Sequence, residues 1–304
     1  MISLKQLQYA LAVEKTRHFK KAAEMCSVSQ SALSTAITEL EKQLEIQIFE
    51  RDNKKVLITP VGQQFLAKAH KIKMGVDELY MLANAEKDPL SYPMTIGVIP
   101  TIAPYLLPKV LPGLRREFPD FKLSIVEEQS HVLVDMVRKG DIDSAILALP
   151  YEHDGLLAFE FWQEDFFWVT HKDNDHATQQ EITSDELRET KLMLLKDGHC
   201  LKDHALAACK MQNTETDNTL DSTSLHTLIQ MVAGRMGSTL VPGMALDQLV
   251  TGSNELRAVH LNETGPHRRI AFIVRPNYSG LNNIELLMKL FRDQLEQTPD
   301  PVGG

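Results

Sequence analysis

The sequence predicts an α/β protein with a small helical head, one long connecting helix and a larger body of alternating strands and helices. Three observations indicate this class. Helix-period segments fill residues 4–44, a single apolar stripe runs along residues 60–86, and strand-like runs alternate with helical ones from residue 94 onward. A chain of 304 residues is long enough for two or three domains of this kind.

Charge is distributed unevenly along the chain. The net charge is −9, yet residues 1–75 carry 12 Lys and Arg against 7 Asp and Glu (net +5), and the remainder carries 20 against 34 (net −14). A basic head on an acidic body is typical of a protein whose head meets nucleic acid, although chance variation gives the same asymmetry. No run of 18 apolar residues and no signal-peptide pattern at Met1–Val13 occur, so we expect a cytoplasmic protein without a membrane partner.

The first residues have the layout of a winged helix-turn-helix. Apolar spacing predicts three helices and then a hairpin of two short strands: Leu4–Lys15, Lys20–Cys26, Gln30–Leu44, Ile46–Glu50 and Lys55–Ile58. Ser29 is a favourable N-cap for the third helix. We expect the buried face of this helix at Leu33, Ile37, Leu40 and Leu44. In such a unit the third helix enters the DNA major groove.

Polar residues on the head are candidates for contacts with double-stranded DNA. Those on the outward side of the third helix have the side chains that read base edges: Gln30, Ser31, Ser34 and Thr35. The basic residues around them are suited to phosphates: Lys20, Lys21, Arg51, Lys54 and Lys55. The alternative is an ordinary solvated helix face.

A long helix is predicted from Pro60 to about Glu86. Apolar residues follow one another at gaps of three and four: Phe65, Ala69, Ile72, Val76, Leu79 and Leu82. This spacing favours a dimerisation helix, with packing against the chain's own body as the alternative. A Pro- and Ser-containing linker follows at residues 88–93.

The body alternates strands with helices, as βαβ units do. We predict strands at Met94–Ile99, Lys122–Glu127, Ser144–Leu149, Phe166–Thr170, Leu192–Leu195, Ser238–Val241, Arg257–Leu261 and Ile270–Val274. We predict helices at Ala103–Phe118, His131–Lys139, Leu201–Met211, Ser224–Arg235 and Leu281–Glu296.

The head resembles that of LysR-type transcriptional regulators. The family's motif falls, in order, on Phe19, Ala22, Ala23, Val28, Ser29, Gln30, Leu33, Ser34, Leu40, Glu41, Leu44, Phe49, Arg51, Thr59 and Gly62. Ser31 departs from it, because the family usually has Pro there. The resemblance implies a two-lobed, periplasmic-binding-protein-like effector domain, and "GRMGSTLVPGMAL" resembles part of its second lobe.

The resemblance also sets the expected domain limits. We expect a DNA-binding domain at residues 1–59, a dimerisation helix and hinge at 60–92, and an effector domain at 93–304. Its first lobe takes in about 93–161 and 267–297, and its second about 162–266.

The three cysteines do not form a disulfide framework or a zinc quartet, and we expect no metal or cofactor. Cys200 lies near a predicted helix N-terminus, where free N–H groups stabilise a thiolate. Nine residues of helix separate it from Cys209 by about 13 Å, and a disulfide requires less than roughly 7 Å between Cα atoms. The pair can therefore join only if the helix unwinds. The alternative is that Cys200 is a small apolar residue at a helix start. We expect Cys26, at the end of the second helix of the head, to pack in the core.

The segments "GVIPTIAPYLLP" and "LMLLKDGHCLKDHALAAC" resemble the OxyR-type branch of this family, which senses hydrogen peroxide. The resemblance implies that Cys200 is the peroxidatic and Cys209 the resolving cysteine. It implies a peroxide pocket at Thr101, Ser130 (usually Thr), His199 and Asp203, with Lys202 in place of a usual Arg. It further implies a homodimer or homotetramer that works with RNA polymerase and is reset by a dithiol reductant.

Other functions remain open on the residues alone. A LysR-type regulator of a small metabolite, with incidental cysteines, is the main alternative. A thiol peroxidase is disfavoured by the head and by the missing peroxidase motif, and a transport solute-binding protein by the missing signal peptide. We therefore expect a regulator of the oxidative-stress response, not an enzyme.

Overall fold

The computed structural model describes residues 2–52, 55–84, 89–196, 198, 200–211 and 224–297. The chain divides into two compact units, Met1–Glu86 and Lys87–Gly304, and each is described by itself. Among the described helices, none combines the length and apolarity that a membrane span requires.

The head unit is a helix-turn-helix followed by a hairpin and a long helix. Its elements are α1 (Leu4–Thr16), α2 (Phe19–Met25), α3 (Gln30–Leu44), β1 (Phe49–Asp52), β2 (Lys55–Ile58) and α4 (Pro60–Asn84). Ser29 caps α3 as predicted, because its hydroxyl accepts the N–H of Ala32. The hairpin is held beside α3 by Glu41, whose carboxylate accepts the N–H groups of Ile48 and Phe49 at 2.7 and 3.0 Å.

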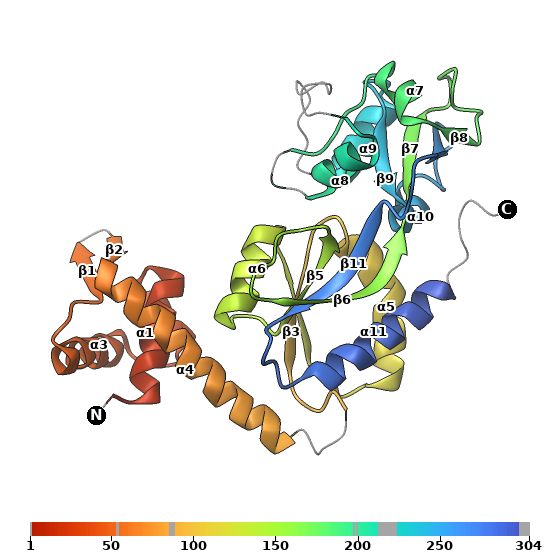
Figure 1. The fold of residues 1–304 in the computed structure, drawn as a ribbon. Helices are drawn as coiled ribbons and strands as arrows, with labels where there is room; N and C mark the ends of the chain where they lie inside the picture. The colour runs from red at the N-terminus through yellow and green to blue at the C-terminus, as the bar shows by residue number, and fades with distance from the viewer. Residues whose placement is uncertain are drawn as a thin grey trace. The chain divides into compact units, whose positions relative to one another are not determined.

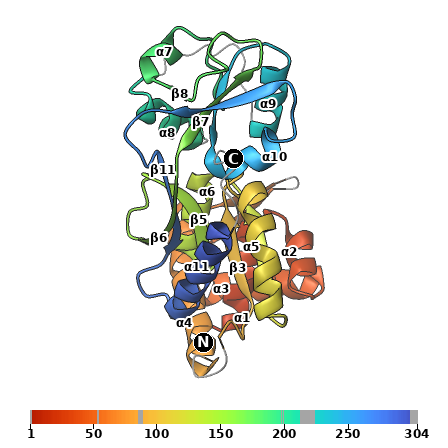
Figure 2. The same ribbon diagram turned by 90° about the vertical axis from the view of Figure 1, so that its right-hand side faces the viewer.

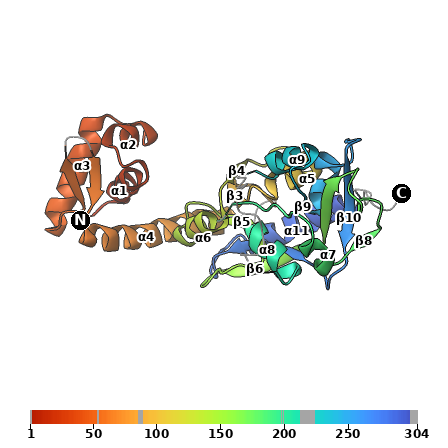
Figure 3. The same ribbon diagram turned by 90° about the horizontal axis from the view of Figure 1, so that it is seen from above.

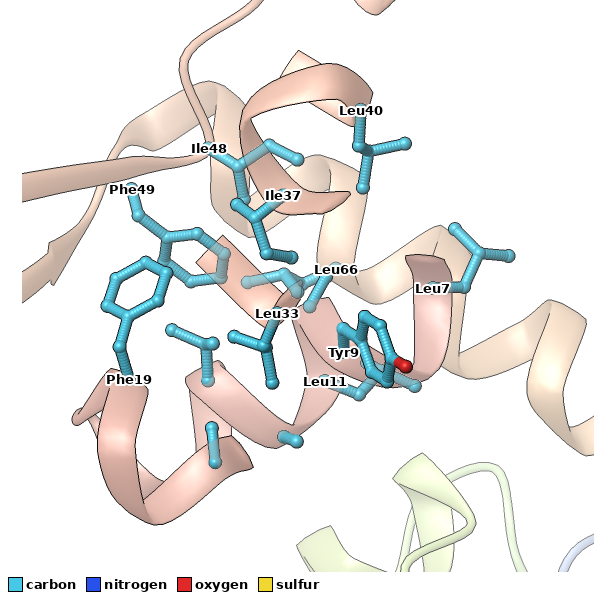
Figure 4. Close-up of a cluster of buried hydrophobic side chains, with 14 of the residues drawn as sticks. Leu7, Tyr9, Leu11, Phe19, Leu33, Ile37, Leu40, Ile48, Phe49 and Leu66 are labelled. Atoms are coloured by element: carbon cyan, nitrogen blue, oxygen red, sulfur yellow. The ribbon is translucent and has the colours of Figure 1, made fainter. Parts of the chain in front are cut away.

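One apolar core unites the elements of the head (Figure 4). The predicted buried face of α3 is confirmed at Leu33, Ile37 and Leu40, which are 0 % exposed, whereas Leu44 is only partly buried against the same core. Phe19 of α2 meets Phe49 of β1 edge to face, with ring centroids 6.2 Å apart. The core therefore fixes α3 against both α2 and the hairpin, so that the polar side of α3 stays outside.

Helix α4 leaves part of its apolar stripe uncovered. Leu66 and Ala69 are buried against the rest of the head. His70 is tied to Glu14 of α1 at 2.8 Å. Beyond this contact Ile72 is 48 % and Leu79 is 65 % exposed.

The second unit contains two sheets (Figure 1). The five-stranded sheet has the order β4-β3-β5-β11-β6, formed by β3 (Met94–Val98), β4 (Leu123–Glu127), β5 (Ser144–Leu149), β6 (Leu157–Glu164) and β11 (Arg268–Val274). Strands β3, β4 and β5 are parallel, and β11 runs antiparallel to β5 and β6. Helices α5 (Ala103–Glu117) and α11 (Leu281–Glu296) lie side by side on this sheet (Figure 2), and α6 (Ser130–Lys139) also packs on it.

The other sheet has four strands in the order β8-β10-β7-β9. They are β7 (Phe166–His171), β8 (Glu181–Ile182), β9 (Thr239–Pro242) and β10 (Leu256–Leu261). Around them lie α7 (Ser184–Arg188), α8 (Cys200–Ala208) and α9 (Leu225–Ala233) (Figure 3). The 3-10 turn η2 (Gly243–Ala245) and α10 (Leu246–Leu249) follow β9. The chain crosses between the sheets twice, from β6 to β7 and from β10 to β11. This is the two-lobed arrangement that the family resemblance implied.

Several details differ from the sequence-based expectations. The predicted strand Leu192–Leu195 contributes an isolated bridge between Leu192 and Ser238 and is not a strand of either sheet. The strands β6 and β8, the helices α7 and α10 and the turn η2 were not predicted, and the strand expected at Ile46–Glu50 is found at Phe49–Asp52. The predicted helix Leu201–Met211 begins one residue earlier and ends at Ala208, because Lys210 adopts a left-handed backbone conformation (φ 51°).

Candidate functional site

Residues from three loops meet at one edge of the five-stranded sheet. Thr101 lies in the loop after β3, Ser130 begins α6 after a two-residue connection from β4, and Pro150 follows β5. Carboxyl ends of parallel strands lie at the same edge of a sheet, where open α/β sheets usually hold their ligands. Thr101 and Ser130 are 4 % and 2 % exposed, so their hydroxyls belong to the interior.

Arg268 is fully buried and holds Thr101. It begins β11 and is 0 % exposed. Its guanidinium donates to the Thr101 hydroxyl oxygen at 3.1 Å and to the Thr101 carbonyl at 3.3 and 3.4 Å. Because a guanidinium can only donate, the Thr101 oxygen is the acceptor and its own hydrogen remains free for a third group.

A buried carboxylate balances this charge. Glu164, at the end of β6, lies 3.6 Å from Arg268, and its other oxygen accepts the N–H of Met244 at 2.9 Å. Burial raises the pKa of Glu164, while Arg268 and the Met244 N–H oppose that shift. The ion pair of Glu164 and Arg268 therefore links the end of β6, where the chain crosses to the other sheet, with the sheet edge that carries Thr101.

Cys200 is the first residue of α8 and is 4 % exposed. The turn before it contains Gly198 at φ 98°, a conformation that strains other residues. A Cβ at this glycine would lie 3.1 Å from the side-chain oxygen of Gln129. Since Gln129 directly precedes Ser130, the turn before Cys200 lies against the N-terminus of α6. His199 lies outside the described residues.

The first turns of α8 face the segment after β5. His204 is 3 % exposed, and its Nε2 donates to the Pro150 carbonyl at 2.8 Å. Burial lowers the pKa of His204 to about 4, although the bond to the Pro150 carbonyl opposes this shift, and the charge of Arg268 adds to it. The pKa of Tyr151 is raised by burial first and then by the charges of Cys200, Glu152 and Asp203.

The other pocket candidates on α8 differ in exposure. Asp203 is exposed in the first turn of the helix. Lys202 is 5 % exposed, so its stem is inside the protein.

Cys209 lies immediately after α8 and is 0 % exposed. Burial, with a smaller contribution from Glu263, raises its pKa to about 12. The next residue is tied to its surroundings, because Arg188 donates to the Lys210 carbonyl at 3.0 Å and the Lys210 ammonium lies 3.1 Å from Glu263. While α8 is folded, Cys209 is therefore protonated. Nine residues at the helical rise place its Cα about 13 Å from that of Cys200.

The DNA-contact candidates on α2 and α3 lie at the surface. Lys20, Lys21, Gln30, Ser31 and Thr35 are exposed and Ser34 is half-buried. The side chains of Arg51 and Lys55 and the whole of Lys54 lie outside the described residues. Cys26 packs against the head core, as expected, and is half-buried.

Comparison with known proteins identifies the family. Residues 4–63 match the model of the bacterial regulatory helix-turn-helix protein, lysR family, and residues 87–296 match the LysR substrate binding domain. The chain belongs to the LysR family. The LysR-type resemblance of the sequence is thereby confirmed.

Relatives extend over nearly the whole chain. The HTH-type transcriptional regulator EstR of Acinetobacter baylyi is 34 % identical over 95 % of this chain and 96 % of its own. The DNA-binding transcriptional dual regulator OxyR of Escherichia coli is 32 % identical, covering 99 % and 98 %. Among solved structures, full-length OxyR of Pseudomonas aeruginosa, a cysteine-to-aspartate variant, superimposes with a TM-score of 0.81 at 32 % identity, covering 96 % and 95 %. A hydrogen-peroxide-bound cysteine-to-serine mutant of Corynebacterium glutamicum OxyR gives 0.68 at 32 %, covering 98 % and 94 %.

Sequence reasoning missed two residues that hold these elements together. Arg268 stands beside Arg269 at the start of a strand, and nothing in the sequence distinguishes the fully buried arginine from its half-buried neighbour. His204 reads as one more polar residue on a helix with a weak apolar pattern. Only the folded arrangement brings Arg268 to Thr101 and His204 to Pro150.

Proposed function

We propose that this LysR-family regulator responds to hydrogen peroxide by oxidation of Cys200. The observation that carries the proposal is the buried cluster at the sheet edge, in which Arg268 holds the Thr101 hydroxyl in the unit that also buries Cys200 at a helix start. The OxyR relatives and the peroxide-bound neighbour support the same assignment.

In the first step the Cys200 thiolate attacks one oxygen of hydrogen peroxide. The S–O bond forms, the O–O bond breaks, and the leaving hydroxide takes a proton to become water. The Thr101 hydroxyl, whose hydrogen Arg268 leaves free, donates to peroxide, and Ser130 supplies a second hydroxyl. His199 and Asp203 complete the pocket. Free N–H groups at the start of α8 stabilise the thiolate.

In the second step Cys209 attacks the sulfenic acid on Cys200, and water leaves as the disulfide forms. The buried thiol of Cys209 cannot do so while α8 is folded, because the two Cα atoms are about 13 Å apart along the helix and its pKa is about 12. Helix α8 has to open, which converts oxidation into a change of fold in the segment around it. A cellular dithiol returns two electrons and two protons and restores the helix.

The remaining parts carry the signal to DNA. We propose that residues 1–59 bind double-stranded DNA, 60–92 dimerise and 93–304 sense. The exposed Ile72 and Leu79 of α4 form one apolar contact between copies. The free edge of β4 is a second, beside a groove of about 600 Å³ whose apolar lining is Leu111, Leu114, Phe118, Phe121, Leu123 and Ile125. Two contacts of this kind assemble a tetramer, which acts in the cytoplasm with RNA polymerase.

A promoter-binding assay with cysteine variants tests the proposal. Stoichiometric peroxide should change the DNA footprint of the wild type, and Cys200→Ser should abolish the change. Cys209→Ser should form sulfenic acid without a lasting change of footprint. If Cys200→Ser leaves an inducer response intact, the protein is instead a metabolite-responsive LysR regulator.

A further inference from the structure

The hydrogen bond from His204 to Pro150 joins the two lobes at the helix that has to open. His204 lies on α8 beside the four-stranded sheet, and Pro150 directly follows β5 of the five-stranded sheet. The bond is 2.8 Å long and the histidine is 3 % exposed. A carbonyl can only accept, so Nε2 carries the hydrogen and the neutral ring leaves Nδ1 as a bare acceptor. That Nδ1 is buried and has no hydrogen-bond partner among the described residues.

We propose that His204 is a positioning residue that holds α8 closed and thereby sets the rate of the resolving step. The inference rests on the proposed Cys200–Cys209 disulfide. His204 lies four residues after Cys200 and five before Cys209, in the middle of the segment that must unwind. We expect the unwinding that brings Cα atoms about 13 Å apart to within roughly 7 Å to pass through residue 204 and to move it away from Pro150. The bond to the other lobe therefore breaks before the disulfide forms.

The ion pair that follows the end of α8 is weaker than this bond. Lys210 reaches Glu263 at 3.1 Å, but its side chain is 73 % exposed, and exposed ion pairs contribute little. The donor of the His204 bond is shielded from water, so breaking the bond leaves a buried N–H unsatisfied until the helix has moved. Because the pKa of His204 is about 4, the ring stays neutral and the tie is constant at physiological pH.

Two substitutions of nearly equal polarity, His204→Asn and His204→Gln, separate the loss of the bond to Pro150 from the loss of the imidazole ring. The amide nitrogen of Gln reaches as far as imidazole Nε2 and can donate to Pro150, whereas the amide of Asn ends near the position of Nδ1. We expect His204→Asn to speed disulfide formation after peroxide by roughly fivefold, the usual worth of one hydrogen bond. His204→Gln should stay close to the wild type. Formation of the sulfenic acid, followed by a trapping reagent, should be unchanged in both.

The exposed His226 on α9 provides a matched control, and His226→Asn should change neither rate. Hydrogen exchange of the α8 amides in the reduced full-length protein gives a second readout, and it should speed up by the same factor in His204→Asn alone. If His204→Asn folds poorly, His204→Ala also lacks the donor and takes its place.

Equal rates of disulfide formation in the Asn, Gln and wild-type proteins would overturn the proposal that the His204–Pro150 bond limits the resolving step. A Gln variant that behaves like Asn would overturn it as well. A slower first step with an unchanged second step would also overturn it. If the wild type forms no Cys200–Cys209 disulfide, the proposed function fails, and the hydrogen-exchange comparison still decides the role of His204.

Discussion

Replacement of Arg268 by Met tests whether the buried ion pair organises the sheet edge. Arg268 is 0 % exposed and Glu164 is 5 % exposed at the side chain, with 3.6 Å between them. Removing one member of a buried pair costs about 3–5 kcal/mol, because the other charge stays in the interior. Glu164 can reduce this loss by taking up a proton, since its pKa is already raised by burial and Arg268 opposes that shift.

The sign of the pH dependence follows from linkage. With Arg268 gone, the pKa of Glu164 in the folded state rises further above its unfolded value. The folded state then binds the extra proton, so stability falls as pH rises through this interval. Arg268→Met should therefore lose less stability near about pH 5 than near about pH 8. The double variant Arg268→Met/Glu164→Gln should recover about 2 kcal/mol at the higher pH and show little pH dependence.

Tryptophan fluorescence suits this measurement, because both tryptophans, Trp162 and Trp168, belong to the second unit. Urea unfolding of the full chain followed at this signal compares the wild type, Arg268→Met and the double variant. The reasoning is refuted if the double variant is no more stable than Arg268→Met at the higher pH, or if the loss is the same at both pH values.

Three further predictions concern the chemistry and the head. Thr101→Val should slow peroxide oxidation of Cys200 by about 10²–10³-fold in stopped-flow assays, and Thr101→Ser should largely restore it; equal rates in both would remove Thr101 from the pocket. In the reduced protein at about pH 8, only about 10⁻⁴ of Cys209 is thiolate given its pKa of about 12, so alkylation should be far slower than in the urea-unfolded chain, and similar rates would contradict its burial. Gln30→Ala should cost about 1–3 kcal/mol at the specific operator but little on random DNA, whereas Lys20→Ala should weaken both; fluorescence anisotropy distinguishes these from a uniform loss.

The head was predictable because its signals are local. The apolar spacing of Leu33, Ile37 and Leu40 and the cap at Ser29 are set within one helix, and the structure has both. Helix α7 has five residues, too few for an apolar period, and β8 has two. Their places depend on pairing and packing with distant segments, as in the parallel pairing of β8 with β10.

The candidate site was predictable only in part. The segment around Cys200 and Cys209 can be recognised by resemblance, because its cysteines and flanking residues are contiguous. Arg268 is 167 residues from Thr101 in sequence, and its role depends on which of two adjacent arginines turns inward. Successive side chains of β11 point to opposite faces of the sheet, and the pairing of β11 with β5 and β6 decides which face is buried. The sequence of β11 alone does not reveal that pairing.

Thiol analysis of the full-length protein after about one equivalent of peroxide tests the central claim most directly. Alkylation followed by peptide mass spectrometry should show the loss of two free thiols, a peptide crosslinked between Cys200 and Cys209, and an unmodified Cys26. Modification of Cys26 alone, or no reaction of any thiol short of a large excess of peroxide, would contradict the account and leave a LysR-family regulator with a different signal.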